Sequence, residues 1–86
     1  MSNDYDRIRL GIEFMTAYTT DNAMLAAYVD ERRREDPAAA EHLMDGTAAL
    51  CAYLLRKLAN DTGTTEHTVL QELARAAHRN EQRSQE

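Results

Sequence analysis

The fold is decided by the stretch AAAEHLMDGTAALCAYLLRKLAN, residues 38–60. Its apolar residues recur at steps of three and four, so they fall on one side of a 3.6-residue helix. The stripe consists of Leu43, Met44, Thr47, Ala48, Leu50, Cys51, Leu54, Leu55 and Leu58. A stripe on one side of a helix is typical of packing on that side. We therefore predict an amphipathic helix over residues 37–61, with this stripe as its core face.

The ends of this helix carry local signals. Asp36 is a good N-cap, and Pro37 suits the first helical position because its missing N–H would have no partner there. Gly63 can adopt the left-handed conformation that ends a helix. Gly46 costs roughly 1 kcal/mol inside a helix, so it marks either a break or a close approach of another backbone. The stripe keeps its phase from Leu43 to Leu50, which favours an unbroken helix.

Length and composition indicate one small domain, which we place at residues 1–79. A chain of 86 residues buries only about 60% of its unfolded surface, so a second copy would add useful burial. The net charge of −5 argues against a generic nucleic-acid binder, because such proteins concentrate Lys and Arg. A single cysteine, no signal peptide and no apolar run near ~20 residues predict a cytoplasmic protein without a membrane span.

Residues 1–20 allow two interpretations. Ile8, Leu10, Ile12 and Phe14 alternate with polar residues, as they would in a half-buried strand. In helical spacing the same segment has one apolar stripe through Ile8 and Ile12, and an opposed stripe formed by Leu10, Phe14 and Ala17. We predict a helix over 4–18, because a lone strand has no sheet to join. The alternative is an N-terminal strand followed by three helices.

Two further helices are expected. Thr20 or Asp21 can cap a helix over 21–35, and another is expected over 65–79, followed by a disordered tail at 80–86. The predicted fold is therefore all-α, a small four-helix bundle organised around the long helix.

The sequence offers little for catalysis. The only cysteine, Cys51, lies on the most apolar helical face, where a thiol is usually buried and inert. Glu41, His42 and Asp45 could share a metal, but ligands on one helix without others from a second helix are usually solvated polar residues. We expect no enzyme activity, no metal and no cofactor.

Two surfaces could bind a partner. The run DERRRED, residues 30–36, is typical of a solvated helix end, and its Arg32, Arg33 and Arg34 are candidate contacts to a protein. Residues 54–77 resemble a helix-turn-helix unit through the spacing of Ala59, Gly63 and Val69. That resemblance implies DNA binding, with contacts from His67, Arg75 and Arg79. Glu66 and Glu72 put negative charge on the same helix, which makes DNA the weaker alternative.

We predict a small acidic helical domain for protein interaction and regulation, non-catalytic and homodimeric. The dimer is expected because the first helix has two opposed apolar stripes. If one covers the long helix, the other, formed by Leu10, Phe14 and Ala17, would meet water. Exposed apolar clusters usually mark an interface, and a twofold dimer is the commonest solution.

Overall fold

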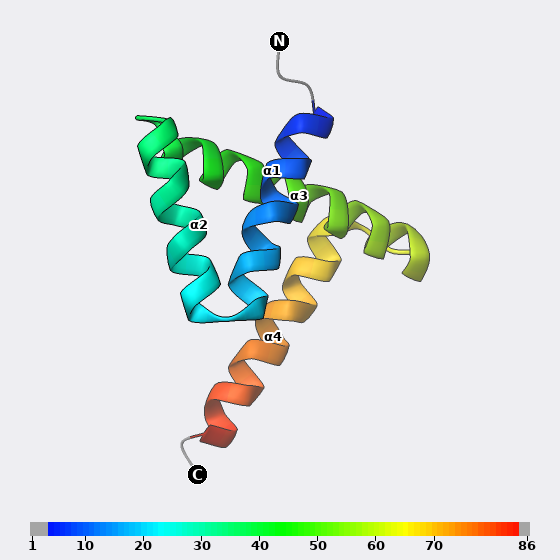
Figure 1. Cartoon of the computed structure of the whole chain (residues 1–86). Coiled ribbons are helices and arrows are strands. Elements are labelled where there is room, and N and C mark those ends of the chain that lie inside the picture. The colour runs from blue at the N-terminus through cyan, green and yellow to red at the C-terminus, as the bar shows by residue number, and fades with distance from the viewer. Residues whose placement is uncertain (1–3, 85–86) are drawn as a thin grey trace. The chain divides into compact units, whose positions relative to one another are not determined.

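The computed structural model describes residues 4–84, and within that range the chain is all-α with four helices (Figure 1). The helices are α1 (Asp4–Thr20), α2 (Asn22–Glu35), α3 (Ala39–Thr62) and α4 (Glu66–Ser84). The prediction of four helices is confirmed, and residues 7–14 belong to a helix, so the strand alternative is wrong. A helix forms there because the residues of α1 find apolar partners on α2 and α3.

The contacts divide the chain into two compact units, Met1–Ala52 and Tyr53–Glu86, which we call unit 1 and unit 2. Unit 1 holds α1, α2 and the first part of α3. Unit 2 holds the last part of α3 and α4. The prediction of one domain over residues 1–79 stays a prediction.

Polar caps and one glycine set most helix ends. Asp21 is the N-cap of α2, and its carboxylate accepts a hydrogen bond from the Met24 N–H at 2.6 Å. At the end of α3, Gly63 has φ of 67°, and the Thr64 N–H donates to the Ala59 carbonyl at 2.9 Å. This hydrogen bond with a left-handed glycine is a Schellman cap. The prediction that Gly63 ends the long helix is confirmed.

Two predicted helix ends are wrong. α3 begins at Ala39, because Pro37 and Ala38 form a turn in which the Ala38 N–H donates to the Asp36 carboxylate at 2.9 Å. α4 continues to Ser84, so residues 80–84 extend the helix where a disordered tail was expected. These residues include Glu, Gln and Arg, which are good helix formers, and contain neither Gly nor Pro. Residues 85–86 of that predicted tail lie outside the described residues.

Two glycines bring α1 and α3 together. Gly11 and Gly46 are both buried, and a Cβ built on Gly46 would lie 2.8 Å from the Arg7 carbonyl oxygen and 3.1 Å from the Gly11 nitrogen. A Cβ on Gly11 would clash with the Gly46 carbonyl oxygen. The backbones therefore cross at a distance that only glycine allows. The helix does not break at Gly46, as predicted.

α2 packs beside α1 in unit 1 (Figure 1). The rings of Phe14 and Tyr28 lie 6.4 Å apart, and the Arg32 guanidinium lies 5.6 Å from the centre of the Tyr28 ring. Arg32 also pairs with Glu13 on α1 at 3.6 Å. These contacts join the middle of α1 to the last turns of α2.

The core contains few and mostly small side chains. Among the described residues the buried hydrophobic ones are Ala17, Ala39, Leu43, Ala59 and Val69. The prediction that the whole α3 stripe faces the core is wrong, since Met44 is 71% exposed and Leu54 is 52% exposed. The side of α3 that packs on α1 is centred on Gly46, because the close approach there is possible only on the glycine side. Much of the apolar stripe is left uncovered.

Candidate functional site

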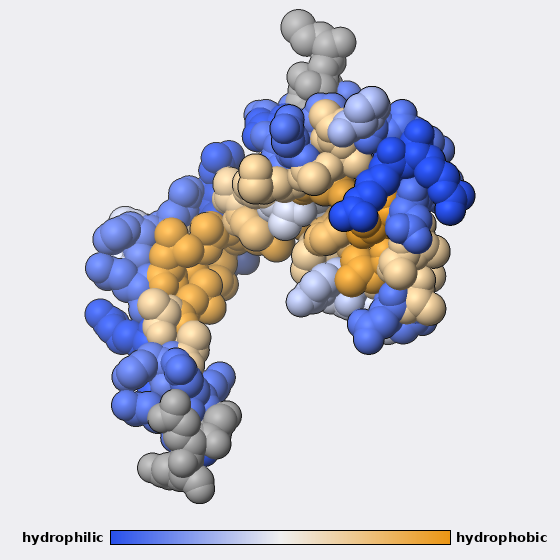
Figure 2. All heavy atoms as spheres, turned by 90° about the vertical axis from the view of Figure 1, so that its left-hand side faces the viewer, coloured by the Kyte–Doolittle hydropathy of each residue, from blue (hydrophilic) through white to orange (hydrophobic). Residues whose placement is uncertain are grey.

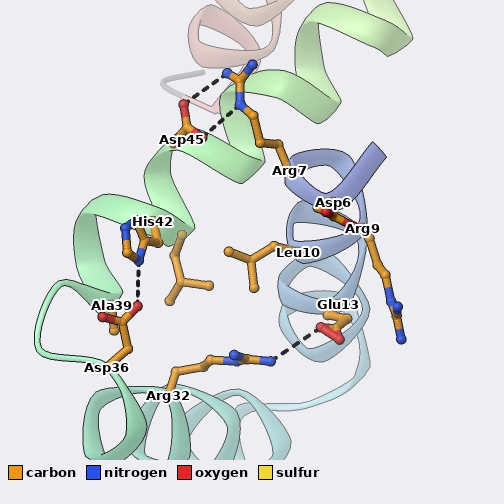
Figure 3. A pocket seen from close by; sticks show the side chains of 11 residues that line it. Asp6, Arg7, Arg9, Leu10, Glu13, Arg32, Asp36, Ala39, His42 and Asp45 are labelled. Carbon is orange, nitrogen blue, oxygen red and sulfur yellow. Dashed lines mark hydrogen bonds and ion pairs between the residues drawn. The ribbon is translucent and has the colours of Figure 1, made fainter. Parts of the chain in front are cut away.

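Unit 1 has a charged pocket of about 580 Å³ between its three helices (Figure 3). Arg7 donates to both carboxylate oxygens of Asp45, from Nε at 2.8 Å and from Nη2 at 2.9 Å. The Nδ1 atom of His42 lies 2.5 Å from the Asp36 carboxylate. Together with the Arg32–Glu13 pair, these contacts form three pairs of opposite charge in the pocket.

The pairs hold their groups in the charged form. The hydrogen bond from Arg7 lowers the pKa of Asp45, and the hydrogen bond with His42 lowers the pKa of Asp36. The hydrogen bond with Asp36 in turn raises the pKa of His42. None of these carboxylates is shifted toward the protonated form that a general acid would need at neutral pH. Two of the pairs link helices, Arg7 of α1 to Asp45 of α3 and Arg32 of α2 to Glu13 of α1.

An apolar groove lies on the same unit, between α2 and α3 with Phe14 of α1 in its lining. Its volume is about 550 Å³. The lining residues are Phe14, Val29, Arg33, Ala39, Ala40, Leu43, Met44, Thr47, Ala48 and Cys51. Arg33 is the only charged residue among them. A concave surface lined by aliphatic side chains and one methionine is typical of a site for another apolar surface.

Unit 2 has an exposed apolar stripe on α4. Leu70 is 50% exposed and Leu73 is 54% exposed, and Ala77 follows on the same face at helical spacing. Figure 2 shows apolar residues gathered on this helix, which ends at the grey C-terminal residues. Leu54 and Leu58 of α3 are also about half exposed. Unit 2 thus exposes leucines that a two-helix unit cannot cover by itself.

The predicted orientation of α1 is wrong. Ala17 is 3% exposed, and Leu10 and Phe14 are half-buried, so this stripe faces the inside of unit 1. Ile12 and Tyr18 on other sides of α1 are exposed. The Gly11–Gly46 crossing turns the Leu10 side toward α3, since the Leu10 Cβ would lie 3.2 Å from a Cβ on Gly46. The proposed dimer therefore needs another surface.

The three arginines of the charged run have different surroundings. Arg32 is occupied by Glu13 and Tyr28, Arg33 lines the apolar groove, and Arg34 lies beside Glu31 and Glu35 on the outer side of α2. The residues considered for DNA, His67, Arg75 and Arg79, are all exposed on α4.

Two further sequence predictions can be compared with the structure. Cys51 is exposed and lines the groove, so its predicted burial is wrong. Of the three residues weighed as metal ligands, His42 and Asp45 are paired with Asp36 and Arg7. Among residues 4–84 no group of three or more His, Cys, Asp or Glu side chains is placed to hold a metal.

Sequence reasoning missed the groove. Its lining includes the small or branched side chains of Val29 on α2 and of Ala40 and Ala48 on α3. No helix in the described part of the chain is long and apolar enough to cross a membrane.

Comparison of the chain with protein-family models, curated proteins and solved structures finds no match.

Proposed function

We propose that the protein is a small non-catalytic helical domain for protein interaction and regulation, and that it acts as a homodimer. The observation that carries this proposal is the imbalance between core and surface. The described residues bury five hydrophobic side chains, three of them alanine, while ten large hydrophobic side chains are 44–71% exposed. Apolar surface of this extent on a small chain is typical of an interaction surface.

The free energy gained by covering this apolar surface is similar in size to the free energy that dimerisation costs. Met44, Leu54, Leu58, Leu70 and Leu73 are each about half exposed or more. Covering the exposed part of such a side chain is worth about 1 kcal/mol, so two copies together supply on the order of 10 kcal/mol. Association costs roughly 4–15 kcal/mol in lost translational and rotational freedom. The two magnitudes are comparable, and at the smallest cost the net gain of about 6 kcal/mol corresponds to a dissociation constant of tens of micromolar.

The charged pocket supports a non-catalytic role. Two of its carboxylates, Asp45 and Asp36, have lowered pKa values because they are hydrogen bonded to Arg7 and His42. A catalytic carboxylate that donates a proton at neutral pH instead has a raised pKa. The pocket's charges act as links between α1, α2 and α3.

Light scattering coupled to gel filtration tests the proposal. The chain has a mass of 9.8 kDa, so a dimer has twice that mass, about 20 kDa. We expect the dimer mass at tens of micromolar and a shift toward the monomer on dilution. A mass of 9.8 kDa at high micromolar concentration would refute the homodimer.

DNA binding is a second candidate, favoured by one observation. Ala59 and Val69 are buried and Gly63 has positive φ, as the resemblance to a helix-turn-helix unit implies. Under this alternative His67, Arg75 and Arg79 would contact the duplex. A gel-shift titration at low salt separates the candidates, because a DNA complex should form there and weaken steeply as salt rises. We expect no shift.

A further inference from the structure

We propose that α4 of a second copy docks in the apolar groove of unit 1, and that the docking is reciprocal. Each chain then offers its own α4 and receives the α4 of the other chain. This inference rests on the homodimer proposed above and names the two surfaces that form it.

The two surfaces have compatible lengths. The groove is concave and about 550 Å³ in volume, and the residues that line it on α3 extend from Ala39 to Cys51. At 1.5 Å per residue this is roughly 18 Å of helix. The exposed stripe on α4 runs from Leu70 to Ala77, roughly 10 Å, so it is short enough for the groove. A ridge of leucines entering a groove between helices is the usual form of helix packing.

The groove can also adapt to the side chains that enter it. Met44 is 71% exposed and lines the groove, and methionine adjusts its shape to irregular partners. The neighbouring Ala40 and Ala48 are exposed and small, which lets a second helix approach α3 closely. The site is therefore suited to a helix that carries leucines.

Charge favours the same pairing. Arg33 is the only charged residue in the lining of the groove. On α4, Glu66 precedes Leu70 by four residues and Glu81 follows Ala77 by four, so both acids lie on the face of the apolar stripe. Of the two acids, Glu66 lies 3.7 Å from Arg56 of its own chain, which leaves Glu81 as the partner for Arg33 of the groove. Such complementarity fixes register and excludes wrong partners.

The net charges of the two units favour the same contact. Unit 1 has five arginines against ten Asp and Glu residues, a net charge of −5. Unit 2 has five Lys and Arg against five Asp and Glu, a net charge of zero. Two copies of unit 1 placed face to face would repel each other, whereas unit 1 against α4 meets no net repulsion.

Reciprocity needs a twofold axis, because a groove-to-ridge contact without one builds a ring or an open chain of copies. If α4 of one chain occupies the groove of another, the second chain still offers an α4 and the first still has an empty groove. A twofold axis satisfies both at once and closes the assembly. The same contact is then made twice in one dimer, and no open chain of copies forms.

Complementation between two variants of the full chain tests this arrangement. Ala48→Glu places a charge in the groove, and Leu73→Glu places a charge on the ridge. Both positions are exposed, so the helices should persist in circular dichroism. We expect each variant alone to weaken dimerisation by at least a hundredfold. Mixed one to one, they should form a heterodimer, because the intact groove of one accepts the intact ridge of the other. Native mass spectrometry with one variant isotope-labelled detects it.

A charge reversal provides the second measurement. Arg33→Glu should raise the dissociation constant about tenfold, and Arg34→Glu, the matched control outside the groove, should leave it unchanged. If wild type is dimeric and either Ala48→Glu or Leu73→Glu stays fully dimeric, the groove and ridge are not the interface. If the mixture gives no heterodimer at the highest concentration reached, the reciprocal docking is wrong. If wild type is a monomer, the homodimer proposal itself fails.

Discussion

Replacing Gly46 by alanine should destabilise the protein, although helix propensity alone predicts the opposite. Alanine in place of glycine inside a helix stabilises by about 1 kcal/mol. In unit 1 the added Cβ would lie 2.8 Å from the Arg7 carbonyl oxygen and 3.1 Å from the Gly11 nitrogen. Both are backbone atoms, so relief requires α1 to move away from α3. Overpacking of this kind costs roughly 1–3 kcal/mol, so we expect a net loss of up to about 2 kcal/mol after the gain in propensity.

The assay is urea unfolding followed by far-UV circular dichroism, with wild type and variant at equal concentration because a dimer's midpoint depends on concentration. Ala52→Gly is the matched control, since Ala52 is exposed on the same helix. Helix propensity alone predicts that Gly46→Ala stabilises the protein and that Ala52→Gly destabilises it by a similar amount. The close crossing of α1 and α3 predicts that both substitutions destabilise it. A Gly46→Ala variant more stable than wild type would refute the close crossing of α1 and α3.

Three further perturbations have definite outcomes. Leu43→Ala removes a buried side chain and should lower the free energy of unfolding by about 2–5 kcal/mol. Leu54 is half exposed, so Leu54→Ala should lower it clearly less in the same urea titration. Equal losses for the two variants would contradict the burial pattern. Gly63→Ala forces a side chain into φ of 67° and should cost roughly 1–2 kcal/mol; an unchanged melt would argue against the left-handed cap. Asp36 raises the pKa of His42 above its ordinary 6.5, so this pair's contribution is complete below pH 6.5 and is lost as pH rises through the raised value. His42 lowers the pKa of Asp36 below 3.8. At acid pH the contribution of the pair is therefore lost as pH falls through that lowered value. Between pH 6 and 8.5 the melting temperature should therefore fall more steeply for wild type than for His42→Gln. If the two melting temperatures fall in parallel, the pair makes no contribution.

The helices could be predicted because their signals are local. The three-and-four spacing in residues 38–60, the cap at Asp21 and the turn at Gly63 act within a few residues of the chain. The start of α3 could not be predicted because Asp36 ends α2 and also holds the turn before Ala39. A cap shared between two helices cannot be assigned from one of them alone.

The packing could not be predicted from amphipathic patterns. α1 has two apolar stripes, and the pattern does not say which one meets α3. The choice depends on Gly11 and Gly46, which permit contact only on their own sides of the two helices. The feature of the sequence that indicates this contact is the presence of one glycine in the middle of each helix. The apolar stripe of α3 is wider than the surface α1 covers, so sequence alone could not show that Met44 and Cys51 would line an open groove.

The contact between copies can be observed directly by isotope-filtered NOE spectroscopy. The sample mixes equal amounts of ¹³C-labelled and unlabelled wild-type chain, so that filtered cross-peaks arise only between copies. We expect cross-peaks from the methyl groups of Leu70 and Leu73 of one copy to Met44 and Val29 of the other. Cross-peaks confined to Leu70 and Leu73 themselves, or none at all, would contradict the docking of α4 in the groove of a second copy.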